Sequence, residues 1–160
     1  VKIGKPKWRE LNMAINQAVC ATFKEQVLLG EHDIVDNTIN LALYSSSATL
    51  DANTAAYSAT DEVGDSGTYA AGGGTLASAT VGLTKTNATA STAFVDFANL
   101  SFTSATIAAQ AAVIYNASNA SNVNAAIAVL DFGGVKTSTN GTFTIAFPTN
   151  DATSAILRLS

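Results

Sequence analysis

The segment TINLALY at residues 38–44 has the clearest structural signature in this chain. Large aliphatic side chains stand at every second position, at Ile39, Leu41 and Leu43, with smaller or more polar residues between them. Successive side chains of a strand point to opposite faces, so this period of two predicts a β-strand with one apolar face.

The same alternation recurs in short segments along the rest of the chain, separated by Gly, Asn, Ser and Thr. About eight short strands with turn signals between them are typical of a sandwich or a jelly roll. Helical segments do not alternate with these strands, which argues against a parallel doubly wound sheet. The sequence therefore predicts an all-β fold, an antiparallel β-sandwich that is jelly-roll-like. The further predicted strands are 76–84, 93–97, 100–103, 109–116, 125–132, 142–147 and 155–159.

Glycine-containing motifs predict the turns between these strands. Asn-Gly at 140–141 is typical of a two-residue β-hairpin, and Gly-Gly at 133–134 marks a second break. Residues 45–74 are polar and aperiodic, so we expect an excursion with functional potential or a loop ordered by its neighbours. The glycine run at 72–74 lacks the Lys-Ser/Thr of a phosphate-binding loop and predicts a turn or a close backbone approach.

Before the first strand the apolar spacing changes to that of a helix. Ile15, Val19 and Phe23 are four residues apart, which would place them on one face. Gly30 follows this apolar stripe, at a position where glycine often ends a helix. The sequence therefore predicts one amphipathic helix over residues 13–30, which covers an edge or a face of the sheet.

The composition is poor in charge and rich in Ala, Ser and Thr. Charged residues make up 12% of the chain, about half the fraction of an ordinary soluble domain. A mean hydropathy of +0.24 argues against disorder, and no apolar run is long enough for a membrane-spanning helix. We also expect no secretory signal. Cys20 is the single cysteine, so we expect a small buried side chain rather than a disulfide or a metal ligand.

The charges are unevenly distributed along the chain. The first nine residues hold four basic side chains and no acidic one, and all twelve acidic side chains follow them. This division predicts either an arm that lies on an acidic partner or a solvated terminus. We divide the chain into a basic arm (1–12), the helix (13–30) and a β-sandwich domain (31–160). The predicted partner-binding residues lie in the arm and the helix: Lys2, Lys5, Lys7, Trp8, Arg9, Ile15, Val19 and Phe23.

No motif in the sequence is typical of a reaction centre. His32 is the single histidine and lies in a polar turn, so we expect an exposed residue. Asp96 and Asp131 interrupt apolar strands, as paired glycosidase carboxylates could, but alternation favours the solvent face or an interface for both. We therefore expect no catalytic residue, no cofactor and no metal, and a protein that is not an enzyme. One alternative is a Ca²⁺ site in the long loop, without the EF-hand spacing, at Asp51, Asn53, Asp61, Glu62 and Asp65.

A series of segments along the chain is distinctive. They are FKE at 23–25, GEHD at 30–33, INLALY at 39–44, SSATLDANTAAY at 46–57, DEV at 61–63, AAVIYN at 111–116, AVLDFG at 128–133 and STNGTFTIAFP at 138–148. Through these segments the chain resembles a family of small structural proteins of tailed bacteriophages. The resemblance covers nearly the whole chain from Met13 onward, so residues 1–12 lie outside it, as a true arm or an alternative start. It implies a virion component and brings no catalytic residues with it.

Within that class the sequence favours a capsid decoration (cement) protein. It would bind the major capsid protein or other virion proteins in many symmetric copies, as a homo-oligomer or an array, after assembly in the bacterial cytoplasm. Contact with a membrane is not expected, and nucleic acid is a weaker expectation because aromatic residues do not interleave with the basic ones. A protein of the neck, tail or fibre is the first alternative. A carbohydrate-binding adhesin that uses Tyr57, Asp61 and Tyr69 is the second.

Overall fold

The protein is mostly β, with two antiparallel sheets and one short helix near its N-terminus. The structure, a computed structural model, describes residues 15–85 and 91–160. In this part of the chain the larger sheet has the strand order β1-β7-β6-β2-β3, and the smaller has the order β4-β5-β8. The predicted antiparallel β class with one N-terminal helix is confirmed. The elements are β1 (Ala18–Val19), α1 (Ala21–Leu28), β2 (Ile39–Tyr44), β3 (Gly74–Thr75), β4 (Thr80–Lys85), β5 (Ser91–Asp96), β6 (Leu100–Asn116), β7 (Ala125–Ile145) and β8 (Leu157–Leu159).

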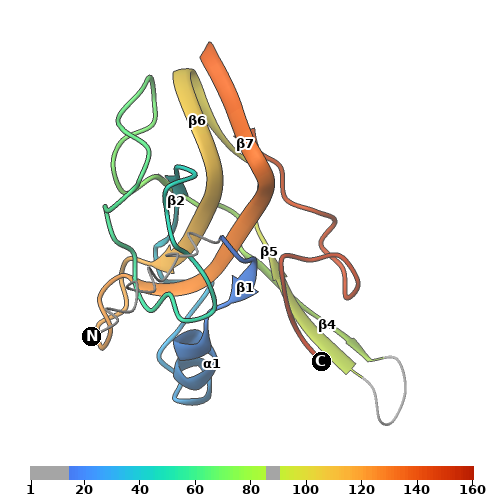
Figure 1. The fold of residues 1–160 in the computed structure, drawn as a ribbon. Coiled ribbons are helices and arrows are strands. Elements are labelled where there is room, and N and C mark those ends of the chain that lie inside the picture. The colour runs from blue at the N-terminus through green and yellow to red at the C-terminus, as the bar shows by residue number, and fades with distance from the viewer. Residues whose placement is uncertain (1–14, 86–90) are drawn as a thin grey trace, which may run out of the picture.

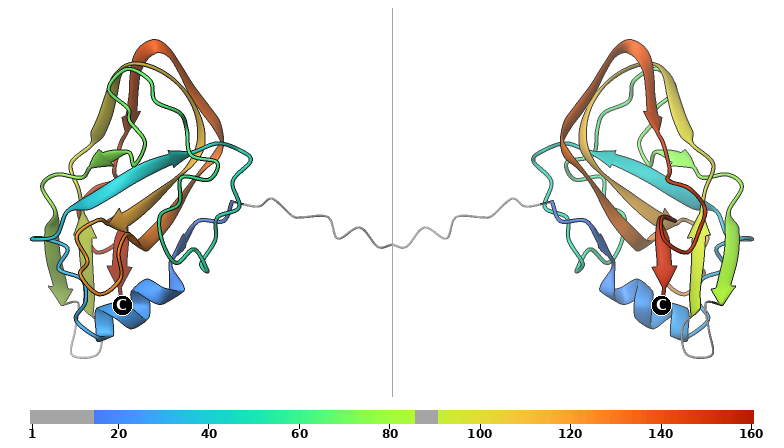
Figure 2. Two further views of the ribbon diagram at one scale, coloured as in Figure 1. Left: turned by 90° about the vertical axis from the view of Figure 1, so that its left-hand side faces the viewer. Right: turned by 90° about the vertical axis from the view of Figure 1, so that its right-hand side faces the viewer.

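Two long strands, β6 and β7, form the spine of the molecule (Figure 1). The predicted strands 100–103 and 109–116 are joined in β6, and 125–132 and 142–147 are joined in β7. The loop between the two long strands is the Asn/Ser-rich segment 117–124. Figure 2 shows that this ribbon rises to a peak and bends over at the end away from α1.

The predicted hairpin turn at Asn140 is wrong, because this residue lies inside β7. Ala105 pairs with Gly141 and Ile107 pairs with Ser138, so two residues of β7 stand opposite one residue of β6. Asn140 takes a left-handed φ of 46° and its N–H donates to Thr106 Oγ1 at 3.0 Å. Asn-Gly thus indicates a left-handed backbone, which a β-bulge uses as readily as a hairpin turn.

A second bulge explains the glycine pair at 133–134. The pairing passes from Ala111↔Asp131 to Ala109↔Lys136, so β7 inserts extra residues without ending. Both glycines have positive φ, 68° and 139°, which favours a residue without a Cβ. Bulges of this kind bend a strand, in accord with the curved ribbon of Figure 1.

The helix is shorter than predicted and begins at Ala21. The N–H of Cys20 donates to Ile127 O at 2.9 Å, and Val19 pairs with Ala128, so the chain here is an edge strand of the larger sheet. Ile15 forms an isolated bridge with Leu50, and both Ile15 and Val19 pack against the core. The four-residue spacing of these apolar residues therefore misidentified the segment as helix. At the other end Gly30 has φ 71°, which confirms its predicted role as the glycine that ends the helix.

One hydrophobic core unites both sheets. It contains Leu41 and Ile114 of the larger sheet together with Val95 and Leu157 of the smaller one. Around the loop 117–124 the paired ends of β6 and β7 are buried at every position, because α1 and the long loop cover them. Cys20 is fully buried there, as predicted, and burial raises the pKa of its thiol to about 11.

Candidate functional site

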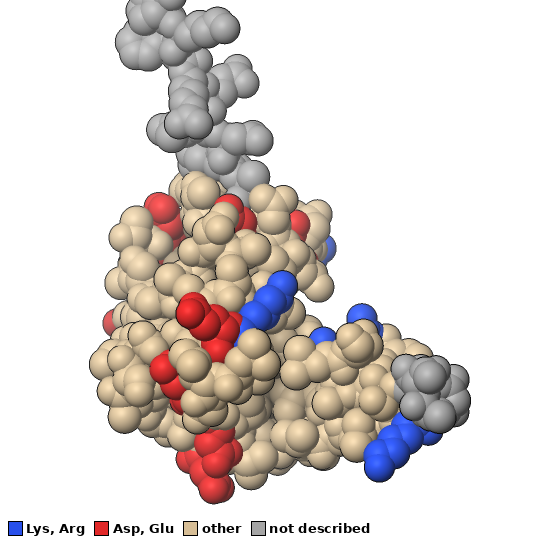
Figure 3. Space-filling model, turned by 90° about the horizontal axis from the view of Figure 1, so that it is seen from below, with Lys and Arg blue, Asp and Glu red and all other residues tan. Residues whose placement is uncertain are grey.

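An apolar groove separates α1 from the smaller sheet. Figure 3 shows the smaller sheet as a lobe beside the main body, with a recess between the two. The groove encloses a cavity of about 160 Å³. Its wall on the helix side contains Val19, Phe23 and Val27, and its wall on the sheet side contains Val95 and Leu157. An apolar recess of this kind is typical of a place where another chain docks.

The sheet side of the groove is an apolar face that the protein only partly covers. The register aligns Val81, Val95 and Leu157 in one row across the three strands, with Leu83, Ala93 and Leu159 in the next row. Residues directly opposite each other share a face, so both rows point the same way. Val95 and Leu157 are 7% exposed, whereas Val81, Leu83 and Leu159 are between 56% and 58% exposed. The outer part of this face therefore remains in contact with solvent.

The predicted partner-binding residues have different positions in the structure. Val19 and Phe23 line the groove, although Phe23 is only 5% exposed and belongs to the core. Ile15 lies apart, where it forms a bridge with Leu50 and packs against the core. The predicted arm residues lie outside the described part of the chain: Lys2, Lys5, Lys7, Trp8 and Arg9.

The sheet side of the groove was not among the predicted partner-binding residues. Val81 and Leu83 belong to a strand that was predicted, and their alternation signals one apolar face. The sequence cannot show that no element covers this face, because that depends on where α1 and the larger sheet lie. The exposed charges of these three strands are Lys85 and Arg158, while acidic side chains are spread over the main body (Figure 3).

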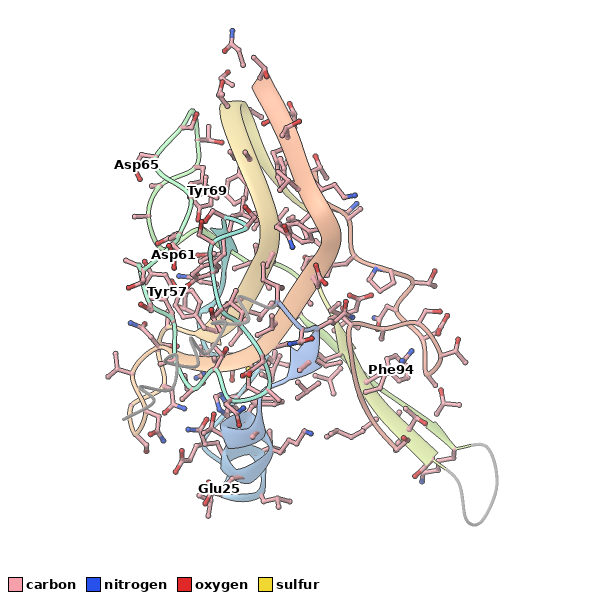
Figure 4. The ribbon with its side chains drawn as sticks, in the orientation of Figure 1. Glu25, Tyr57, Asp61, Asp65, Tyr69 and Phe94 are labelled. Carbon is pink, nitrogen blue, oxygen red and sulfur yellow. The ribbon has the colours of Figure 1, made fainter. Side chains whose placement is uncertain are left out.

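A second feature is a cluster of tyrosines around Glu62. Tyr57 Oη donates to Glu62 Oε2 at 2.6 Å, and Tyr69 Oη donates to Glu62 Oε1 at 2.8 Å. The N–H of Gly72 donates to the same Oε1 at 2.7 Å. Glu62 is held in place because its backbone forms a bridge with Tyr44 at the end of β2. Figure 4 shows Tyr57 and Tyr69 beside β2 and β6, on the side of the molecule that carries the long loop.

All four tyrosines of the chain belong to this cluster. Tyr115 stacks on Tyr57 with ring centroids 4.7 Å apart and donates from its hydroxyl to Gly72 O at 2.8 Å. Tyr44 Oη donates to Ser58 O at 2.6 Å. These contacts fasten the excursion 45–74 to the sheet, and this outcome agrees with the prediction of a loop ordered by its neighbours.

The tyrosine cluster holds the long loop through hydrogen bonds between tyrosine hydroxyls and the Glu62 carboxylate. Burial, and then hydrogen bonding to Glu62, raises the pKa of Tyr57 above its ordinary value of 10.0. Burial is also the main reason that the pKa of Tyr69 is raised. Both hydroxyls therefore stay protonated and donate at neutral pH. Tyr69 is 2% exposed and its hydroxyl is already engaged, so a sugar could reach only Tyr57 and the exposed Asp61.

The acidic side chains of the long loop make separate hydrogen bonds and do not form one cluster. Asp51 Oδ1 accepts from the N–H of Asn53 at 2.7 Å, and Asp65 Oδ1 accepts from the N–H of Ala71 at 2.7 Å. Asp61 is exposed, and both Glu62 oxygens accept hydrogen bonds. Within residues 15–85 and 91–160, no group of three or more His, Cys, Asp or Glu side chains could hold a metal ion.

Asp96 and Asp131 lie on strands of different sheets. Asp131 is half-buried and accepts from the N–H of Gly133 at 2.9 Å, within the bulge of β7. Asp96 is 4% exposed, which corrects the expected solvent face, and it accepts from the N–H of Phe97 at 3.0 Å. Burial raises the pKa of Asp96. Each carboxylate thus accepts a hydrogen bond from the backbone of its own segment, rather than from a shared site.

His32 is half-buried rather than exposed, which corrects the expectation from its polar turn. Its Nε2 is 2.8 Å from Gln26 Oε1, an acceptor, and its Nδ1 is 3.1 Å from Asn116 Nδ2, a donor. This arrangement assigns the proton to Nε2 and leaves Nδ1 as an acceptor, the neutral tautomer. Phe23 packs edge-on against the ring at a centroid distance of 4.9 Å.

Acid should destabilise the protein through His32. Burial lowers the pKa of His32 below its ordinary value of 6.5, although Glu31 opposes the shift. The unfolded chain therefore binds a proton at His32 more readily than the folded protein does. The free energy of unfolding should keep its full value above pH 6.5 and fall as the pH drops below 6.5. This decline is at most about 1.4 kcal/mol per pH unit. Urea unfolding between pH 8 and pH 5 measures this decline. The variant His32→Gln should lack it, and an equal decline in that variant would contradict the assignment.

Comparison of the chain with protein-family models, with curated proteins and with solved structures gave no match. In the described residues no helix is long and apolar enough to cross a membrane.

Proposed function

We propose that the protein is a non-enzymatic structural component of a bacteriophage virion, a decoration (cement) protein that stabilises the head shell. The observation that carries this proposal is the uncovered apolar face beside α1, in a chain with very few charges. Desolvating charged groups is costly, so a charge-poor surface with an apolar face suits repeated protein contacts. The resemblance of the sequence to virion proteins of tailed phages supports the same class.

The distribution of charge suggests which part of the chain attaches to the shell and which part is displayed. The basic segment 1–12 and α1 would engage the acidic surface of the major capsid protein, and the sheets would face solvent or neighbouring copies. Val19 and Phe23 line the groove beside the apolar face. The tyrosine cluster supports a structural role because its hydroxyls are used up in hydrogen bonds that hold the long loop in place.

Removal of residues 1–12 tests the attachment. We expect the truncated protein to bind the shell more weakly, and the native protein to lose affinity as salt rises, because exposed charges are screened. Co-sedimentation with shells that lack the protein, at low and high salt, measures both effects. The variant Lys136→Gln, which removes an exposed cation elsewhere, is the matched control and should bind normally. Equal binding by the truncated and native proteins would refute the role of the arm.

The first alternative places the same protein in the neck, tail or fibre, where a few copies would form a ring or trimer. Copy number per particle separates the two positions, because a shell needs many copies and a ring needs few. The adhesin alternative retains exposed Asp61 and half-buried Tyr57 as sugar contacts. A glycan array without binding would eliminate it.

The two sheets around one core also support a sandwich as the finer description of the fold. A jelly roll has eight strands in two Greek keys. The jelly-roll-like arrangement stays a prediction, since the strand orders β1-β7-β6-β2-β3 and β4-β5-β8 match a jelly roll in strand number and do not by themselves give two Greek keys.

A further inference from the structure

The strand β4 has a free edge. It pairs with β5 on one side, from Thr80↔Asp96 to Lys85↔Ser91 without a register shift, and no described strand pairs with its other side. None of its six residues is buried. Natural proteins usually protect such edges with proline, inward charges or bulges, and β4 has only Lys85 at its end. The backbone N–H and C=O groups of this edge are therefore available for pairing.

Exposed apolar side chains accompany this free backbone edge. Val81 is 58% exposed and Leu83 is 57% exposed, and both lie on the groove face of the smaller sheet. On the opposite face of β4, the residue in the middle of the strand, Gly82, is covered. A Cβ on Gly82 would lie 2.4 Å from the ring of Phe94, so this ring covers Gly82 (Figure 4 labels Phe94).

We propose that β4 pairs with β4 of a second copy of this chain, antiparallel, about a two-fold axis at Gly82. Val81 then lies opposite Leu83 of the second copy on one face, and Thr80 lies opposite Thr84 on the other. Each copy presents the same strand, so the contact is isologous and closed. The result is one continuous six-stranded sheet whose two grooves open on the same side.

The pattern of the strand selects this register. A shift by one residue would place the apolar face of one copy level with the polar face of the other. An axis at Leu83 would place Lys85 opposite Val81. With the axis at Gly82, Lys85 lies opposite Ala79, and the two lysines are six positions or about 20 Å apart. That separation exceeds the Debye length of about 8 Å at physiological salt, so their repulsion is screened.

This inference goes beyond the proposed function and does not depend on it. In a decorated shell the pairing would join neighbouring copies, but it is measured on the free protein. A protein that dimerises without binding shells would refute only the proposed function. A protein that binds shells as a monomer would refute only this inference.

Sedimentation equilibrium of the full chain over a range of concentrations tests the pairing. We expect a dimer for the native chain and at least a tenfold weaker dimer for Leu83→Lys, because lysine at an edge opposes pairing. The matched control is Leu28→Lys, at a leucine that is 89% exposed and lies on α1. It should dimerise like the native chain. Circular dichroism verifies that both variants fold. A native chain that stays monomeric, or equal dissociation of both variants, overturns the proposal.

Cysteine cross-linking tests the register. Chains with Thr80→Cys mixed with chains with Thr84→Cys should form a disulfide under mild oxidation, because these positions are opposite in the proposed pair. Each variant alone should cross-link much less, since its cysteines would be four positions apart. Cys20 is fully buried and does not compete. Equal cross-linking of the mixture and of the single variants would reject this register.

Discussion

Replacement of Gly73 by alanine should lower the free energy of unfolding by about 4 kcal/mol. Gly73 has φ +77°, and a Cβ there would lie 1.8 Å from Leu41 O and 2.7 Å from the Cα of Ala42. These are backbone atoms of β2, which lies between β6 and β3 in the larger sheet and cannot move aside as the end of a flexible side chain can. The new methyl group would therefore separate β3 from β2. Denaturant unfolding followed by circular dichroism measures the loss.

The matched control is Gly64→Ala in the same long loop. No heavy atom lies within 4 Å of a Cβ built on Gly64. We expect this variant to change the stability by less than about 0.5 kcal/mol. Equal stability of the two variants would mean that Gly73 does not approach β2 as closely as described. A large loss at Gly73 would support the close backbone approach that the glycine run predicts.

Removal of the Glu62 side chain should have the second largest effect, a loss of about 3 kcal/mol for Glu62→Ala. The carboxylate accepts from two tyrosine hydroxyls and from the N–H of Gly72. Hydrogen bonds to a charged group stabilise more than hydrogen bonds between neutral groups. In the variant the hydroxyl of Tyr69, a residue that is only 2% exposed, would also lose its carboxylate acceptor. The long loop should then detach in part, which hydrogen exchange of its amides would detect.

Two variants control for the loss of a charge. Glu25 is exposed on α1, so Glu25→Ala should leave the stability nearly unchanged (Figure 4). Glu62→Gln keeps one oxygen for Tyr69 and Gly72, while Tyr57 can turn its hydroxyl to accept from the amide. We expect a loss between those of the other two variants. If Glu62→Ala were as stable as Glu25→Ala, the cluster would not hold the loop.

The positions of the strands could be predicted from the sequence because alternation depends only on local burial. The segment 38–44 nearly matches β2. The full length of β6 and β7 could not be predicted. Residues with positive φ, such as Ser104, Gly133 and Asn140, usually mark the end of a strand, but here they form bulges and the strands continue past them. The start of the helix was misplaced for a related reason, since Val19 satisfies a helical spacing and a strand equally well.

The candidate site was predictable only on its helix side. Val19 and Phe23 emerged from their spacing, and both line the groove. The exposure of Val81 and Leu83 depends on the angle between two sheets, which no local pattern encodes. The cluster around Glu62 could not be predicted either, because its hydroxyls come from residues up to 71 positions apart along the chain, Tyr44 and Tyr115.

The arrangement of β6 and β7 has a consequence for folding kinetics. Asn116 and Ala125 close the ribbon through a short loop, so pairing can propagate from there with little loss of chain entropy. By contrast, Ile39 pairs with Asn116 only after the intervening chain has been brought round. Contacts between residues distant in sequence form slowly, so the ribbon is a natural nucleus. Although β2 is synthesised before both long strands, it would then wait for a template made from residues that follow it.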